Sequence, residues 1–352
     1  MSNIFVKRRN AAVRRLLKKQ QADAYITLSI LEQRYLSGVD LMQGEAVFLI
    51  TARQTYGVTK QMLASKIAGA DKDIKIHLAQ LGGILDGALQ LVRQKKLKKV
   101  LFDGSLVTLD EGEKLLHAGC VRCDGLLASL RAKKSADEAA KLKRACQIAS
   151  DAFAAVKPQI KTGMTEDELR SLIATEMLRR GADVVEYNIV AFGENTADVH
   201  HMPSVKRKLK NNEAVLMDFG CFYQGYVSDM TRSWWHGGKE PAEYTRIWNL
   251  VDKARKAAIK LLKAGVRAGA VDNAARSIIC AEGHGEEFCH TTGHGVGLYV
   301  HERPFLRDKS QEIVCEQAAV TIEPGIYFQG KWGIRLEDTF LVTKTGRKKL
   351  TY

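Results

Sequence analysis

The chain has 352 residues, a formal net charge of +14 and 45% hydrophobic residues, which allows about two domains with a full core. No stretch approaches the roughly 20 uninterrupted apolar residues of a membrane span, so we expect no membrane partner. The seven Cys are odd in number and scattered, which is typical of reduced thiols. The basic N-terminal stretch lacks the apolar segment and cleavage site of a signal peptide, so we expect a cytoplasmic protein.

The excess of Lys and Arg raises nucleic acid as a partner. These residues are scattered, however, as in the stretches 94–99, 131–134 and 206–210. No aromatic residues alternate with them as stacking platforms for bases. A solvated basic surface is our interpretation, and we do not expect a nucleic-acid partner.

Residues 1–130 alternate between helix and strand patterns. Helix patterns cover 7–21, 61–69 and 83–95, and strand patterns cover 24–29, 45–51, 73–79 and 98–104. This alternation predicts an α/β lobe with a largely parallel or mixed sheet. The lobe contains no cluster of catalytic residue types.

Residues 131–352 are predicted to form a second domain that begins with helices. Ser135 with Glu138, and Thr165 with Glu168, have the spacing of capping boxes at two helix starts, and Gly181 fits the end of the second helix. Strand patterns follow over 184–193, 214–220 and 223–234, then a helix over 245–265, then strands after about 297. This order predicts an α+β domain whose helices pack on an antiparallel sheet.

Four carboxylates and one imidazole of this domain lie in short apolar, β-branched and Gly-containing runs: Asp218, Asp229, His294, Glu323 and Glu337. Unpaired buried carboxylates are very costly, and most of these have no Lys or Arg embedded beside them. Two divalent cations would neutralise four carboxylates, and the His adds a neutral ligand. The pattern therefore predicts a metal centre.

The two Asp flank a short reversal at 223–225. A turn centred between Tyr223 and Gln224 would place Asp218 and Asp229 directly opposite each other on one face of a hairpin. Two like charges at that distance repel unless a cation lies between them or one holds a proton. We therefore expect the pair to bind metal, although capping of turns is the alternative for each Asp alone.

The two Glu form a similar pair. Glu323 ends an apolar strand, and the Pro-Gly pair at 324–325 predicts a type II turn. The chain is predicted to reverse near Gly330 before Glu337. Arg335 should lean to the same face as Glu337, because the two are two residues apart on a strand.

Histidines gather around these carboxylates. His290 and His294 have the spacing of a zinc-protease pair on a helix, but the surrounding Thr and Gly argue against a helix. Gly on both sides of His294 permits close backbone approach to the site. With His301, three His lie within twelve residues, which favours function over a satisfied core histidine. Either His200 or His201, in a polar loop, can place an imidazole over the site.

The strings DFG…YVSDMTRS, TGHGVGLYVHE, TIEPGIY and GIRLEDT occur in the order found in the pita-bread metallopeptidase family, M24. This family contains Xaa-Pro aminopeptidase, Xaa-Pro dipeptidase (prolidase) and methionine aminopeptidase. The second domain resembles the family throughout, and the first lobe more loosely resembles the creatinase/prolidase N-terminal domain. RLEDT and the separate lobe resemble the Xaa-Pro branch, since methionine aminopeptidases usually carry a His in place of Asp338.

The resemblance implies that one metal ion is bound by Asp218, Asp229 and Glu337, and a second by Asp229, His294, Glu323 and Glu337. It further implies that the catalytic residues are Glu323, His200, His290, His301 and Arg335. Glu323 would move a proton, the histidines would contact substrate or intermediate, and Arg335 would support the metal-binding Glu. Counting forward from Asn195 selects His200, whereas counting back from Asp218 selects His201.

The implied cofactors are two divalent ions, Mn2+ first, with Co2+ or Zn2+ as alternatives. The implied reaction is hydrolysis of Xaa-Pro bonds, at peptide N-termini or in dipeptides, by a metal-bridged hydroxide. The implied partners are a peptide with Pro at its second position and a second copy of the chain in a homodimer. The alternative function is a non-enzymatic pita-bread-fold binding protein that uses its basic surface. A hydrolase of non-peptide C–N bonds is a weaker rival, because such relatives lack the metal ligands.

Overall fold

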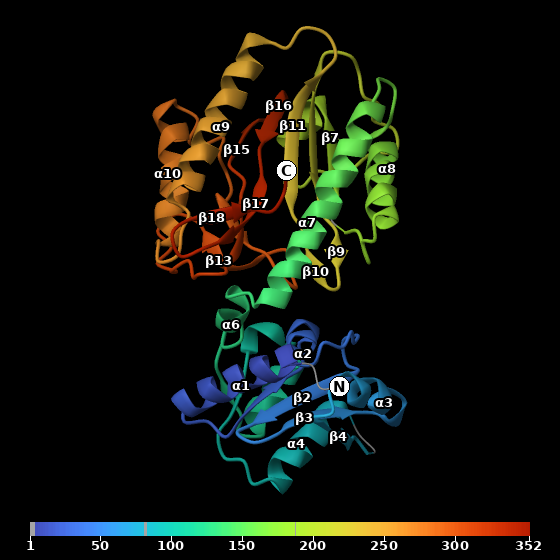
Figure 1. Cartoon of the computed structure of the whole chain (residues 1–352), viewed down its shortest axis with the longest axis vertical. Helices are drawn as coiled ribbons and strands as arrows, with labels where there is room; N and C mark the ends of the chain where they lie inside the picture. Colours follow the sequence, from blue (N-terminus) through green and yellow to red (C-terminus); the bar gives the residue numbers. More distant parts are fainter. Residues whose placement is uncertain (1–3, 81–82, 187) are drawn as a thin grey trace. The chain divides into compact units, whose positions relative to one another are not determined.

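The structure is a computed structural model that describes residues 4–80, 83–186 and 188–352. The chain divides into two compact units, residues 1–131 and 132–352 (Figure 1). Tyr187, within the strand predicted over 184–193, lies outside the described residues, as do residues 1–3 and 81–82. No helix in the described ranges combines the length and the apolar character that crossing a membrane requires.

The first unit is built around one mixed sheet in the order β4-β3-β2-β1-β5-β6. Its strands are β1 Ala24–Thr27, β2 Ala46–Thr51, β3 Thr55–Thr59, β4 Ile74–Leu78, β5 Val100–Phe102 and β6 Val121–Arg122. Strand β2 runs antiparallel to β1 and β3, whereas the β1–β5, β5–β6 and β3–β4 pairs are parallel. The helices are α1 Ile4–Lys19, α2 Ile30–Ser37, α3 Gln61–Ala70, α4 Ile84–Gln94, α5 Leu109–His117 and α6 Ala128–Ala132. The predicted α/β lobe with a mixed sheet is confirmed.

The second unit opens with two helices, α7 Ala136–Val156 and α8 Glu166–Arg179. Both begin at the predicted capping boxes, with Ser135 before α7 and Thr165 before α8. Gly181, at a φ of 98°, follows the end of α8 as predicted. Two further helices, α9 Ala242–Leu261 and α10 Ala268–Ala281, come after the first group of strands.

The strands of this unit form hairpins and small sheets. They are β7 Ile189–Phe192, β8 Glu213–Phe219, β9 Phe222–Tyr223, β10 Tyr226–Val227, β11 Met230–His236, β12 Gly293–Gly295, β13 Glu302–Leu306, β14 Ala319–Ile322, β15 Gly325–Phe328, β16 Trp332–Arg335, β17 Asp338–Val342 and β18 Arg347–Lys349. Every strand pairing in the described part of this unit is antiparallel, which confirms the predicted α+β architecture.

Two apolar clusters hold the helices against these strands. One joins α7 and α8 to β7, β8 and β11, and includes Ile148, Leu169 and Met217. The other joins α9 and α10 to β14, β15 and β16, and includes Val251, Val271 and Ile334. Figure 1 shows the two helix pairs on opposite sides of this unit. The strand ends between them carry the candidate site.

Lys157, at the end of α7, gives this unit a predicted pH dependence. Its Nζ lies 3.0 Å from the centre of the Trp234 ring, and burial lowers its pKa from 10.5 to about 7. The unfolded state therefore holds more protons between pH 7 and 10.5, so the free energy of unfolding contributed by Lys157 rises with pH across that window. The penalty for burying the charged amine is largest below pH 7, although the Trp ring offsets part of it.

Lys157→Met is therefore expected to raise the free energy of unfolding most below pH 7, with the gain shrinking toward pH 10.5. Urea unfolding of the metal-free protein at several pH values measures this difference. Lys161→Met, at an exposed position of the same segment, is the control and should show no such trend. A gain independent of pH would contradict the prediction.

Candidate metal centre

The hairpin that carries Asp218 and Asp229 has a different register from the predicted one. Asp218 pairs with Thr231 across β8 and β11, and Tyr223 pairs with Tyr226. The turn is centred between Gln224 and Gly225, which have φ values of 47° and 77°. Two successive positive φ values suit the tight turn that matches the right-handed twist of a hairpin. The predicted direct opposition of the two Asp is therefore wrong, and they are diagonal neighbours that line the same cavity.

The second acidic pair does face across its hairpin. Ile322 pairs with Asp338, and Gly325 pairs with Arg335, so Glu323 and Glu337 lie opposite each other between these two pairs. The predicted type II turn at 324–325 is wrong, because Gly325 has no positive φ and begins β15. A Cβ on Gly325 would instead overlap the hydroxyl end of the Tyr327 side chain, which explains the Gly. The predicted reversal at Gly330, with a φ of 74°, is confirmed.

His294 lies on the short strand β12 rather than on a helix, as predicted. Its Nδ1 donates to the carbonyl oxygen of Gly295 at 3.1 Å, which directs Nε2 to the carboxylates. Nε2 lies 3.2 Å from Glu323 Oε1 and 3.6 Å from Asp229 Oδ2. The flanking Gly residues permit close approach of neighbouring strands, because a Cβ on Gly293 would overlap the carbonyl oxygen of Thr321. The Gly residues therefore let the backbone around His294 approach the backbone of neighbouring strands, and do not directly make room for a ligand.

All five predicted metal ligands line one cavity of about 1060 Å³. Ligand atoms of Asp229, His294 and Glu337 lie within 4.8 Å of one another, and all three residues are buried. Glu323 joins this group through His294, and Asp218 borders it beside Arg335. The predicted catalytic residues His200, His290, His301, Glu323 and Arg335 line the same cavity. The fold thus places the predicted metal ligands and the predicted catalytic residues around one cavity.

The charges in this cavity do not balance within the protein. Burial first, and then the charge of Asp218, raises the pKa of Asp229 well above its ordinary value. Burial and the charges of Asp229 and Glu323 do the same to Glu337. Burial opposes ionisation of Glu323, but the hydrogen bond and charge of His294 dominate and lower its pKa to about 2. Burial also disfavours the charged form of His294, yet Glu323 and Asp229 raise its pKa to about 9.

These residues fit a divalent cation site. Among the described residues, Oε1 of Glu337 is buried without a hydrogen-bond partner, while Oε2 accepts from Thr231 at 2.7 Å. Such an atom is costly to bury unless a cation meets it. His294 donates its other ring N–H to a backbone carbonyl, which is the usual support of a metal-binding imidazole. Oxygen ligands and one imidazole nitrogen therefore converge where the protein supplies too little positive charge.

Arg335 connects the two acidic hairpins through hydrogen bonds. Its Nη2 donates to Asp218 Oδ2 at 2.6 Å, its Nε to Thr231 Oγ1 at 3.1 Å, and its Nη1 to the Tyr327 hydroxyl at 2.8 Å. Tyr327 then donates to His290 Nε2 at 2.8 Å, because His290 Nδ1 donates to the carbonyl of Thr291. Burial lowers the pKa of His290 to about 4, which agrees with this neutral tautomer.

Tyr327 was missed by the sequence analysis, although it stands in the string TIEPGIY. Tyr327 and Glu323 are separated by an even number of residues, so on an extended segment their side chains point to the same face. This spacing was the one signal that placed Tyr327 near the site. Both ring nitrogens of His290 form hydrogen bonds within the protein, Nδ1 with the Thr291 carbonyl and Nε2 with the Tyr327 hydroxyl. His301, by contrast, is exposed, and its ring makes no hydrogen bond within the described residues. Its ring lies edge-on to His294 with the centroids 4.4 Å apart.

The structure gives His200 and His201 different surroundings. His201 Nε2 donates to the buried carboxylate of Glu166 at 2.8 Å. This contact gives the His201 ring a structural role. His200 is exposed at the cavity wall. The pKa of His301 is lowered, first because its ring is partly desolvated and then by the charge of His294. His200 is therefore the residue whose ring remains available to the cavity.

Glu166 is a second residue that sequence reasoning missed. Its carboxylate accepts four hydrogen bonds, from Phe192 N, Asn195 Nδ2, His201 Nε2 and Ser204 N. It thereby holds the loop that carries His200. An acidic residue in the first turn of a helix is normally solvated, so no local signal marks Glu166 as buried.

Glu166→Gln is expected to lower the free energy of unfolding by about 2 kcal/mol. The amide N–H2 of the new Gln would face N–H groups that now donate hydrogen bonds to the Glu166 carboxylate, and it cannot accept from them. Urea unfolding of the metal-free protein measures the loss. Glu176→Gln on the same helix, where the ion pair with Arg180 is more exposed, is the control and should cost less than about 1 kcal/mol. Equal losses in the two variants would contradict the role given to Glu166.

Comparison with known proteins identifies the family. The profile of metallopeptidase family M24 matches residues 140–344, and that of the creatinase/prolidase N-terminal domain matches residues 9–133. The chain belongs to metallopeptidase family M24. An uncharacterized peptidase of Staphylococcus aureus is 32% identical over 345 residues, covering 96% of each chain.

Solved structures agree with this M24 assignment. The Xaa-Pro dipeptidase from Bacillus anthracis is 28% identical, with a TM-score of 0.92 over 98% of this chain and 97% of that chain. The prolidase from Pyrococcus horikoshii is 28% identical, with a TM-score of 0.89 over 98% of both chains. The predicted pita-bread fold and the family resemblance are confirmed.

Proposed function

We propose that this M24 peptidase hydrolyses the bond between an N-terminal residue and a following proline, in dipeptides or longer peptides, with two divalent ions. The observation that carries the proposal is the convergence of Asp229, His294 and Glu337 within 4.8 Å, inside a cavity that also holds Asp218 and Glu323. The choice of proline is supported by the Xaa-Pro dipeptidase and prolidase structures that the chain resembles.

In this proposal the two acidic hairpins share the ions between them. Asp218, Asp229 and Glu337 would hold one ion, and Asp229, His294, Glu323 and Glu337 would hold the second. A ligand set dominated by carboxylates favours Mn2+, and the imidazole keeps Co2+ and Zn2+ as alternatives. When bound, the ions supply Lewis acidity that polarises the scissile carbonyl and lowers the pKa of water.

The remaining steps belong to the protein's own groups. The Glu323 carboxylate lines the cavity, and its Oε1 lies 3.2 Å from His294 Nε2, so it is the group we propose to accept a proton and return it to the leaving amine. His301, whose ring nitrogens are unoccupied in the described residues, is better placed than His290 to donate to the developing oxyanion. His200 would contact the substrate from the cavity wall.

The cavity also offers an apolar wall for the ring of proline or for the preceding side chain. It is formed by Ile189, Val199, Pro203, Val300 and Phe305. Apolar walls with a few convergent polar groups are typical of small-molecule and peptide sites. We further propose a cytoplasmic homodimer. The support is the family resemblance for the dimer and the seven free Cys for a reducing compartment.

A peptide panel tests the substrate. Protein reconstituted with Mn2+ should cleave Ala-Pro, Ala-Pro-Ala or both, and should leave Ala-Ala and Ala-Ala-Ala largely intact. The ratio of the rates for Ala-Pro and Ala-Pro-Ala decides between dipeptidase and aminopeptidase activity. Failure to cleave either proline peptide, with bound Mn2+ shown by elemental analysis, would rule out the proline assignment.

The rival function is a binding protein that uses the basic surface implied by the net charge of +14. It predicts protein without bound metal at saturating Mn2+ and without peptidase activity. Salt-dependent binding of nucleic acid that survives loss of the acidic cluster would favour it.

A further inference from the structure

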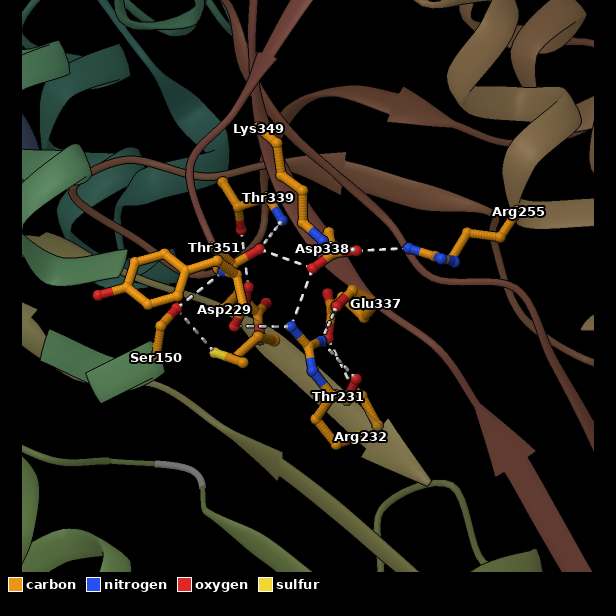
Figure 2. Close-up of polar contacts among 12 residues, drawn as sticks. Ser150, Asp229, Thr231, Arg232, Arg255, Glu337, Asp338, Thr339, Lys349 and Thr351 are labelled. Carbon is orange, nitrogen blue, oxygen red and sulfur yellow. Dashed lines mark hydrogen bonds and ion pairs between the residues drawn. The ribbon is translucent and has the colours of Figure 1, made fainter. Parts of the chain in front are cut away.

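A second set of charges lies directly behind the candidate metal ligands. We call it the Asp338 cluster: Asp338 with Arg232, Arg255, Lys349 and Thr351 (Figure 2). The Asp338 side chain is only 2% exposed, yet neither it nor Arg232 lines the cavity. Three cations therefore surround one buried carboxylate that does not reach the proposed substrate.

Arg232 connects this cluster to Glu337. Its Nη2 donates to Asp338 Oδ1 at 3.0 Å, while Nη1 donates to the backbone carbonyl of Glu337 at 2.6 Å and to that of Thr231 at 3.0 Å. The ion pair with Asp338 therefore orients the planar guanidinium so that Nη1 can donate to the backbone carbonyls of both Thr231 and Glu337.

Glu337 is consequently fixed at three points. Arg232 holds its carbonyl oxygen, and its N–H donates to the Thr231 carbonyl at 3.2 Å. The Thr231 hydroxyl holds Oε2 at 2.7 Å, which leaves Oε1 directed to the proposed ions. The carboxylate has little freedom to turn while Arg232 keeps the two backbones together.

The same cluster reaches Asp229. Thr351 donates to Asp338 Oδ1 at 2.8 Å and accepts from Thr339 N at 3.2 Å. The Thr339 hydroxyl in turn donates to the backbone carbonyl of Asp229 at 2.7 Å. Figure 2 shows Asp229 and Glu337 joined in this way to Asp338. The two residues proposed to bridge the ions are thus fixed from one buried carboxylate.

We propose that Arg232, oriented by Asp338, is a positioning residue that sets the metal affinity of the site through Glu337 without touching metal or substrate. The inference rests on the proposed metal centre. Partners that orient metal ligands typically change metal affinity by about 10-fold to 100-fold when removed. A purely structural ion-pair cluster would change the stability of the metal-free protein and leave metal affinity as it was.

Calorimetric titration of metal-free protein with Mn2+ separates these two roles. Arg232→Gln removes the contact with the Glu337 carbonyl and leaves Asp338 its pairs with Arg255 and Lys349. We expect its Mn2+ affinity to fall by about 10-fold or more. Lys349→Met is the matched control, because it also removes a cation from Asp338 but touches neither Glu337 nor Thr231. Its Mn2+ affinity should equal that of the parent.

The outcomes are distinct. Parent-like Mn2+ affinity in folded Arg232→Gln, or an equal loss in Lys349→Met, overturns the positioning role while the proposed function stands. If Arg232→Gln does not fold, Arg232→Lys decides, since it keeps a cation beside Asp338 but cannot hold both carbonyls in the guanidinium geometry. A parent protein that binds no Mn2+ overturns the proposed metal centre itself.

Discussion

Asp229→Asn is expected to lower kcat/KM for an Xaa-Pro peptide by at least about 100-fold, since loss of groups that merely orient metal ligands already costs 10–100-fold. Asp229 is one of three residues, with His294 and Glu337, whose ligand atoms lie within 4.8 Å of one another. In the proposed site it would bind both ions, so no remaining side chain would replace it. Steady-state hydrolysis of Ala-Pro or Ala-Pro-Ala at saturating Mn2+ measures the effect.

The same variant should not unfold the metal-free protein. Burial and the charge of Asp218 raise the pKa of Asp229, so a neutral amide relieves a repulsion that the carboxylate creates. The melting temperature without metal should therefore be unchanged or higher. Asp252→Asn, which removes a carboxylate paired with Arg255 on α9, is the control and should retain activity. Retention of most of the activity by Asp229→Asn would contradict the metal assignment.

Arg335→Met is expected to lower the free energy of unfolding by about 3–5 kcal/mol, which is the usual cost of removing one partner from a buried ion pair. The Arg335 side chain is 2% exposed and pairs with Asp218 at 2.6 Å. Met keeps most of the volume but leaves Asp218, Thr231 and Tyr327 without their donor. Urea unfolding of metal-free protein gives the value directly.

The control for this stability effect is Arg170→Met. Arg170 lines the same cavity, but its ion pair with Asp167 is partly exposed, with side-chain exposures of 42% and 32%, and should contribute less than about 1 kcal/mol. A similarly small loss for Arg335→Met would show that Arg335 is not the buried counter-charge that the geometry indicates.

The sequence predicted which residues line the site better than it predicted how those residues pair across the strands. The candidate ligands could be recognised because each lies within a short string whose residue types agree with burial, as around Asp218 and Glu337. The register of the first hairpin could not be predicted, because nothing local indicates that Gln224 adopts a φ of 47°. That displacement of the turn is enough to change the partner of Asp218 from Asp229 to Thr231.

Residues that act through long-range contacts escaped prediction for a different reason. Glu166 accepts from Ser204, 38 residues away, and Arg232 donates to the carbonyl of Glu337, 105 residues away. Helix α2 was also missed, because its buried residues include Glu32 and Gln33, which obscures the apolar pattern. Local strings determined which groups enter the site, whereas the packing of distant strands determined how they are held.

Stepwise titration of the metal-free protein with Mn2+, with hydrolysis of Ala-Pro or Ala-Pro-Ala measured at each step, tests the central claim most directly. The proposed site predicts no hydrolysis without metal and a plateau when two ions are bound per chain. Full hydrolysis of the proline peptide by protein shown to contain no metal would contradict it.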